Sequence, residues 1–174
     1  PDHFFTLKNV VKMEEEALAA GADARNPYSA LGKFFRAFFY DQMSKRVGDL
    51  PLTEALKGIE QFEPSYDSQK DIYVQILNWL DESNSDLAAL IADGNNTIAG
   101  DFYFGGDLKQ WQKAVNSMQL RVLLTLSKKE NDADLNIKSR FAKILDNPSQ
   151  YPLMSSLGDN LQCISNQFNK YPSN

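Results

Sequence analysis

The stretch PYSALGKFFRAFFYDQMSKRVG, residues 27–48, decides the fold because it carries both the ends and the apolar faces of one long helix. Asn26 is a residue type that caps helix N-termini, and Pro27 suits a first turn, where its missing amide has no partner to lose. Gly48 suits the position just after a helix, and basic residues precede it in the last turn. The sequence therefore predicts a helix over 27–47.

Two faces of this predicted helix are apolar. At about 100° per residue, one broad face carries Tyr28, Leu31, Phe34, Phe35, Phe38 and Phe39, and the other carries Tyr40, Met43 and Val47. A helix that is apolar on two sides is buried between neighbours, as in stacked helical pairs. We therefore interpret these aromatic residues as core, and not as a ligand-binding surface.

The sequence predicts further helices before and after this one. They are expected over about 5–20, from Asp67 or Ser68 to Asp93, from Asp107 to Leu126, and over about 134–145. Ser68, with Asp71 three residues later, is expected to cap the start of its helix. The connection 48–66 is long, with at most one helical turn near 53–57. No segment shows a convincing strand pattern. The sequence therefore predicts an all-α fold of stacked helical pairs, tetratricopeptide-like but without a visible repeat of about 34 residues.

Several side chains carry specific expectations. The run Glu14–Glu16 is interpreted as a solvated face. Trp79 lies within an apolar stripe and is interpreted as core, with sugar stacking as the alternative. Asn116 and Arg121 are expected close to buried surface, where each needs a hydrogen-bond partner. Leucines on the later helices, Leu120, Leu124 and Leu145, are expected to be buried.

The composition limits the available chemistry. The 174 residues carry 18 basic and 23 acidic side chains and no basic stripe, so nucleic acid is not an expected partner. No apolar run approaches the roughly 18 residues that span a membrane. With one cysteine, Cys163, and one histidine, His3, neither an intrachain disulfide nor a Cys/His metal cluster can form. A catalytic triad would depend on His3, near a terminus, and neither a triad nor a cofactor is expected.

Residues 100–107 read GDFYFGGD and place three aromatic side chains in a predicted loop. Either Phe102, Tyr103 and Phe104 form a platform for a ligand, or they close the end of the helical core. The loop fails the EF-hand pattern, because the sixth and twelfth positions counted from Asp93 lack the glycine and the glutamate that such calcium loops need. The sequence therefore predicts no metal here.

The two interpretations of this loop place its rings differently. Asp107 is expected to cap the following helix in either case. If the rings close the core, Phe102 and Phe104 point inward against Trp111, and Tyr103 lies on the opposite side near water. If they form a platform, Tyr103 is the ring expected to stack on a sugar.

Four stretches, taken in order, resemble one protein family. They are KFFRAFFYDQMSKRVGDLPLTEALKG at 33–58, FEPSYDSQKDIYVQILNWLDESNSDL at 62–87, GDFYFGGDLKQWQKAVNSMQLRVLLTLSKK at 100–129, and NQFNKYP at 166–172. The chain resembles the SusD/RagB-like proteins, surface glycan-binding lipoproteins of Bacteroidetes nutrient-uptake systems. The resemblance implies that 1–174 is a single helical domain of a longer chain, because the family's lipoprotein cysteine and its longer C-terminal part are missing here.

The resemblance also implies a function. It implies a lipid anchor at the cell outer membrane, a SusC-like TonB-dependent transporter as partner, and non-enzymatic capture of an oligosaccharide or other nutrient for import. The candidate ligand-binding residues are Tyr103, Phe104 and Phe102, although a motif shared across a family is a poor place to encode specificity. The alternative is a helical interaction scaffold whose main partner is the transporter. A third hypothesis is a glycosidase with two carboxylates, but nothing in the sequence isolates such a pair.

Overall fold

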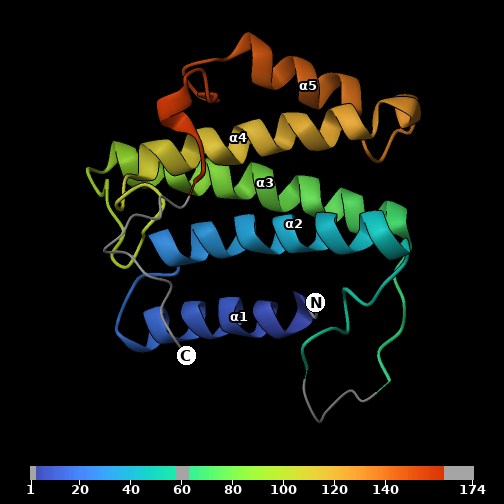
Figure 1. The fold of residues 1–174 in the computed structure, drawn as a ribbon, viewed down its shortest axis with the longest axis horizontal. Helices are drawn as coiled ribbons and strands as arrows, with labels where there is room; N and C mark the ends of the chain where they lie inside the picture. Colours follow the sequence, from blue (N-terminus) through green and yellow to red (C-terminus); the bar gives the residue numbers. More distant parts are fainter. Residues whose placement is uncertain (1–2, 58–62, 163–174) are drawn as a thin grey trace, which may run out of the picture.

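The structure is a computed structural model that describes residues 3–57 and 63–162 (Figure 1). Its helices are α1 (His3–Ala19), α2 (Pro27–Val47), α3 (Gln69–Ala92), α4 (Leu108–Thr125) and α5 (Ile137–Asp146), with two short 3-10 helices, η2 (Ser127–Lys129) and η3 (Leu157–Asp159). Apart from two isolated bridges, the described residues contain no β-structure. The predicted all-α fold is confirmed.

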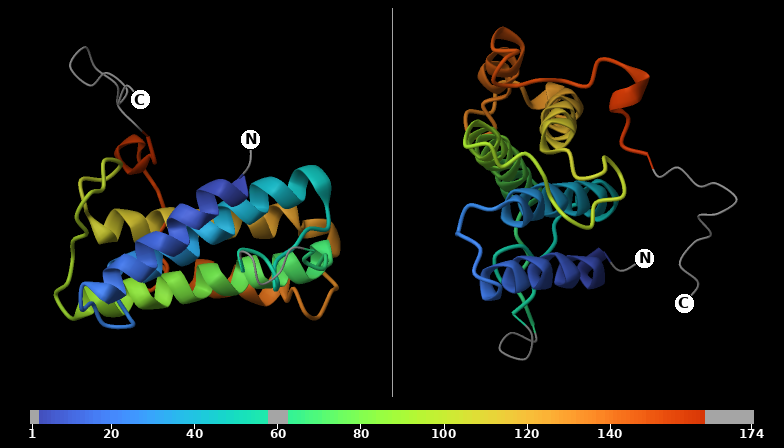
Figure 2. Two further views of the ribbon diagram at one scale, coloured as in Figure 1. Left: turned by 90° about the horizontal axis from the view of Figure 1, so that it is seen from below. Right: turned by 90° about the vertical axis from the view of Figure 1, so that its left-hand side faces the viewer.

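Consecutive helices run antiparallel and stack on one another (Figure 1). The main contacts join α1 to α2, α2 to α3, α3 to α4 and α4 to α5. Figure 2 shows, in its right-hand view, that α3 and α4 lie side by side above α2 while α1 lies below it. Because α2 contacts α1, α3 and α4, it needs apolar residues on two sides. The predicted stacked helical pairs are therefore present.

The helix starts are capped as the sequence predicts. The Asn26 side chain accepts a hydrogen bond from the Ser29 amide at 2.9 Å, and Ser29 returns the contact to complete a capping box. The Ser68 hydroxyl accepts from the Asp71 amide at 3.1 Å at the start of α3. Each such cap contributes about 0.5–2 kcal/mol. By contrast α5 begins at Ile137, later than predicted, and has no side-chain cap.

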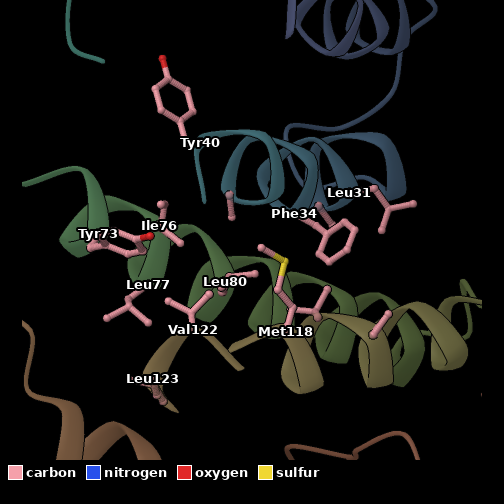
Figure 3. Close-up of a cluster of buried hydrophobic side chains, with 14 of the residues drawn as sticks. Leu31, Phe34, Tyr40, Tyr73, Ile76, Leu77, Leu80, Met118, Val122 and Leu123 are labelled. Atoms are coloured by element: carbon pink, nitrogen blue, oxygen red, sulfur yellow. The ribbon is translucent and has the colours of Figure 1, made fainter. Parts of the chain in front are cut away.

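The core lies where α2, α3 and α4 meet (Figure 3). Leu31 and Phe34 on one side of α2 are buried, as are Tyr40 and Met43 on the other. Each fully buried large apolar side chain contributes roughly 1.5–3 kcal/mol relative to exposure. Trp79 is partly buried and packs against this core, with its ring centroid 5.6 Å from that of Tyr40. Its interpretation as a core residue is confirmed.

Some residues expected to be covered are exposed. Val47, Leu124 and Leu145 are 71%, 60% and 48% exposed. Each is one of the last two residues of its helix, where the neighbouring elements give less cover. Arg121 is also exposed, whereas Asn116 is fully buried and donates to the Pro152 carbonyl at 3.1 Å. The expected partner is therefore present for the side-chain nitrogen of Asn116, while its buried oxygen accepts no hydrogen bond from the described residues. The expectation that Arg121 needs such a partner is wrong, because its side chain faces water.

The interpretation of Glu14–Glu16 as a solvated face is wrong for Glu14, whose side chain is only 15% exposed between α1 and α2, whereas Glu15 and Glu16 are exposed as expected. The Arg36 guanidinium donates two hydrogen bonds to its carboxylate, one of them at 2.9 Å. Burial raises the pKa of Glu14, and the pairing with Arg36 opposes that rise. The register explains the burial, since Glu14 follows Val10 by four residues and Leu7 by seven and so shares their inward face.

None of the described helices is both long enough and apolar enough to cross a membrane. The stacking of antiparallel helices places the connections between them at the two ends of the stack (Figure 1). The connection between α3 and α4, the yellow-green loop at one end of Figure 1, contains the aromatic residues that the sequence singled out.

Candidate functional site

The loop between α3 and α4, residues 93–107, is organised by one carboxylate. Asp101 accepts hydrogen bonds from the backbone amides of Tyr103, Phe104 and Gly106 at 2.8, 3.2 and 3.0 Å. It also accepts one from the indole nitrogen of Trp111 at 2.8 Å. Hydrogen bonds to a charged acceptor are stronger than neutral ones. Asp101 therefore fixes the turn through residues 101–106 and ties it to the first turn of α4.

The end of this loop is equally well defined. Asp107 caps α4 as predicted, accepting from the Lys109 amide at 2.8 Å. Gly106 has a φ of 93°, and a Cβ there would lie 2.5 Å from the carbonyl oxygen of Ile98. The Ile98 amide in turn donates to the Gly106 carbonyl at 3.0 Å. Glycine is therefore required where the returning loop crosses its own start.

The three aromatic side chains occupy different environments. Phe104 is partly buried, with its ring edge-on to Trp111 at a centroid distance of 5.1 Å, so its inward placement is confirmed. Phe102 is 69% exposed, and the expectation that it points inward is wrong. That expectation assumed an extended segment with alternating sides, whereas the hydrogen bonds to Asp101 fold the segment into a turn. Tyr103 is 36% exposed, which agrees with its expected position near water.

The rings form a continuous series from solvent to core. Phe102 and Tyr103 pack with centroids 4.3 Å apart and planes tilted by 34°. Tyr103 then meets Trp111 edge-on at 6.0 Å, and Trp111 meets Phe34 of α2 at 5.6 Å. Each such aromatic pair contributes about 0.5–1.5 kcal/mol beyond burial. The exposed ring of Phe102 is therefore backed by the core and does not stand alone on a loop tip.

An exposed, fixed aromatic ring has a definite chemical use. Its face is apolar and carries negative π-density, and it suits the C–H face of a sugar or another flat, partly apolar group. Ligand sites combine such surfaces with a few polar groups. The same loop exposes Asn95 and Asn96, whose amides both donate and accept hydrogen bonds. The exposed ring and these two amides are therefore the candidate site, and residues 93–107 are called the aromatic loop.

Hollows also lie elsewhere on the described structure. A cavity of about 480 Å³ beside the C-terminal end of α4 is lined by several lysines, among them Lys45 and Lys70. Lys45 pairs with the buried Asp41 at 2.8 Å, and Lys70 pairs with Asp134 at 2.5 Å, so these two ammonium groups already have partners. A smaller groove of about 240 Å³ is mainly apolar and is lined by Phe34, Phe38, Ala114, Ser117, Met118, Arg121, Met154 and Leu161.

The described residues of this loop do not gather a set of metal ligands. Over residues 3–57 and 63–162, no group of three or more His, Cys, Asp or Glu side chains is placed to hold a metal ion. The Asp101 carboxylate faces N–H donors, which compete with any cation for its oxygens. His3 packs against the ring of Phe39 at 5.4 Å. Cys163 and the stretch 166–172 lie outside the described residues.

Comparison with known proteins agrees with this fold. The profile of a SusD-like family described as "Starch-binding associating with outer membrane" matches residues 2–173. The chain belongs to this SusD-like family. The resemblance inferred from the four sequence stretches is thereby confirmed. No curated protein gives a significant match to the chain.

Solved structures give the same assignment. An outer membrane protein of Bacteroides vulgatus ATCC 8482, whose suggested role is nutrient binding, is 37% identical with a TM-score of 0.83, over 98% of this chain and 36% of that one. A SusD homologue of Bacteroides fragilis NCTC 9343 is 39% identical with a TM-score of 0.80, over 98% and 35%. A chitin-binding protein is 27% identical with a TM-score of 0.70, over 89% and 30%. This SusD-like chain thus spans about a third of the length of these structures.

Sequence reasoning found the aromatic residues of this SusD-like chain but missed the residue that arranges them. Asp101 is not among the predicted site residues, although an aspartate side chain in a turn commonly accepts a hydrogen bond from the backbone amide two residues on. That preference predicts the bond from the Tyr103 amide. It does not predict the bond to Trp111, because ten residues and a helix start separate the two side chains.

Proposed function

We propose that this SusD-like chain is one helical domain of a non-catalytic protein that binds glycan at the outer-membrane surface. The ligand would pass to a TonB-dependent transporter of the SusC-like class, and a lipid anchor would hold the protein at the cell surface. Membership in a starch-binding family supports the ligand class. The observation that carries the proposal is the Phe102 ring, which is 69% exposed yet backed by a series of rings from the core.

The hydrogen bonds of the carboxylates in this loop support binding without catalysis. Glycoside hydrolysis needs two carboxyl groups about 5–10 Å apart, with one of them free to give or take a proton. In the aromatic loop Asp101 accepts from three amides and an indole, and Asp107 caps α4. Two of the three carboxylates of the loop, those of Asp101 and Asp107, thus have structural partners, and the third, Asp93, lies at the other end of the loop beside α3. This favours a binding role over the glycosidase hypothesis.

The direct experiment is calorimetric titration of the full-length protein with maltoheptaose and with chitohexaose. These probes represent the polymers named for the family and for one structural neighbour. We expect one of the two oligosaccharides to bind and to be recovered intact by chromatography after incubation. Hydrolysis of the oligosaccharide to shorter products would contradict a non-catalytic role. If neither oligosaccharide binds, the glycan assignment is contradicted.

A second candidate function is a scaffold that docks on the transporter, and the apolar groove between α2 and α4 favours it. This groove combines aromatic residues, methionines and the exposed Arg121, residue types enriched in protein interfaces. Co-purification of the transporter with the full-length protein tests it, with an Arg121→Glu variant for comparison. Transporter capture that is lost in this variant, without binding of any glycan, would favour the scaffold. Protease shaving of intact cells tests the surface location.

A further inference from the structure

We infer that Phe102 is the ring that contacts the ligand, that Tyr103 supports it from behind, and that Asp101 is the positioning residue for both. This inference rests on the proposed glycan-binding function and assigns roles within it. It differs from the sequence-based expectation, which placed the sugar on Tyr103. Three features of the aromatic loop lead to it: the order of the rings, the exposure of each ring, and the hydrogen bonds on either side of Phe102.

The order of the rings leaves one face open. Tyr103 lies between its two neighbours, with Phe102 at 4.3 Å and Trp111 at 6.0 Å. One face of Phe102 is covered by Tyr103, and because the ring is 69% exposed its other face is open to solvent. A pyranose that presents its C–H face can therefore stack on Phe102. Stacking on Tyr103 would require Phe102 to move away first.

Asp101 holds the backbone on both sides of this ring. Phe102 stands between Asp101 itself and Tyr103, whose amide donates to the Asp101 carboxylate at 2.8 Å. The amide of Phe104 and the indole of Trp111 add further bonds to the same group. A ring held in its binding position before the ligand arrives loses less conformational freedom on binding. Asp101 therefore acts on affinity through the position of Phe102 and without touching the sugar.

The first part of the test asks which ring contacts the ligand. The full-length protein and its variants are titrated with maltoheptaose and chitohexaose, using whichever binds. Phe102→Ala should weaken binding about tenfold, the scale of one lost aromatic contact. Tyr103→Phe, which keeps the supporting ring and removes its hydroxyl, should bind like wild type. Phe5→Ala is the matched control, because Phe5 is 66% exposed on the distant start of α1.

The second part asks whether Asp101 acts through Phe102. Asp101→Asn should weaken binding several-fold and shift the NMR resonance of the Trp111 indole N–H, whose acceptor is altered. In a double-mutant cycle, Asp101→Asn should have almost no further effect on affinity once Phe102 is alanine. Asp93→Asn removes the same charge from the same loop, and this control should leave both the affinity and the indole resonance unchanged.

The outcomes separate this inference from the function on which it rests. If wild type binds neither oligosaccharide, the proposed function fails and the inference fails with it. If wild type binds but Phe102→Ala binds equally well, the function stands and the assignment of the ring is wrong. Weakened binding by Tyr103→Phe assigns the contact to the tyrosine hydroxyl instead. If Asp101→Asn weakens binding equally with and without Phe102, its role is general stability and not positioning.

Discussion

In each of the two connections that flank α3, one aspartate accepts several hydrogen bonds, but these two aspartates, Asp67 and Asp101, bind different kinds of donor. In the α2–α3 connection, Asp67 accepts from the Leu52 and Thr53 amides at 2.8 and 3.0 Å and from the Thr53 hydroxyl. In the α3–α4 connection, Asp101 accepts from loop amides and also from the side chain of Trp111. Asp67 therefore ties its connection to itself, whereas Asp101 ties its loop to the core. An aspartate that accepts several hydrogen bonds thus stabilises a local segment in the α2–α3 connection. In the α3–α4 connection it anchors the turn that carries the exposed ring of Phe102, through Trp111, to the core.

The largest effect on stability is expected at Trp111, which anchors the aromatic loop to the core. Trp111→Ala should lower the free energy of unfolding by about 3–5 kcal/mol, because the ring is almost fully buried and its removal leaves a cavity. It also removes a donor from Asp101. Urea denaturation of the purified protein measures the loss, with Tyr66→Ala as control, since Tyr66 is 73% exposed. A loss below about 1 kcal/mol would mean that the loop is not anchored through this ring.

The fold was predictable because its signals are local and repeated. The caps at Asn26 and Ser68 and the two apolar sides of α2 all point to the same arrangement. The errors arise where the partner comes from elsewhere in the chain. The acidic neighbours of Glu14 favour solvent, whereas its position on the inward face of α1 and its partner Arg36 on the next helix favour burial.

The candidate site was predictable in location and not in arrangement. GDFYFGGD was identified from its composition, and the cap by Asp107 was correct. The sides on which the rings lie depend on whether residues 101–106 are extended or turned. That is set by the bonds of Asp101 to amides and to Trp111, which become visible only when the start of α4 is placed against the loop. The error at Phe102 follows from this missing contact.

The second prediction concerns Asp101, the hydrogen-bond acceptor that anchors the aromatic loop. Asp101→Asn should lower the free energy of unfolding by about 1–3 kcal/mol, because the amide that replaces one carboxylate oxygen cannot accept from the donors gathered there. The indole N–H of Trp111 is the costliest of these donors to leave unpaired, since that residue is 1% exposed. The same denaturation measures it, and Asp93→Asn is the charge-matched control. Equal stability of the two variants would contradict the anchoring role of Asp101.

The third prediction concerns the other aspartate and is smaller. Asp67→Asn should cost at most about 1 kcal/mol, because Asp67 is only half-buried and water can replace its carboxylate as the acceptor. Burial by itself would raise the pKa of Asp67, but hydrogen bonds from Thr53 and Leu52 outweigh it, so the pKa is lowered.

This lowered pKa gives the Asp67 prediction a pH dependence. A lowered pKa in the folded state stabilises the protein above the ordinary value of about 4, and this contribution is lost as the pH falls through the lowered pKa. The stability difference between wild type and Asp67→Asn should therefore shrink below about pH 4. Denaturation curves at pH 7 and pH 3 check the sign, and a difference that grows in acid would contradict it.

The smallest effect on stability is expected at Phe102, the exposed ring of the aromatic loop. Phe102→Ala should change the free energy of unfolding by no more than about 0.5 kcal/mol, because most of its ring already faces water. Phe104→Ala, next but one in the same turn, is the matched comparison and should cost about 1–3 kcal/mol, because its ring packs on Trp111. Denaturation of both variants decides between the two original interpretations of GDFYFGGD. If Phe102→Ala costs as much as Phe104→Ala, then another surface covers Phe102 in the protein and the ring closes the core. If Phe102→Ala costs almost no stability and weakens glycan binding, Phe104 anchors the loop to the core and Phe102 contacts the ligand.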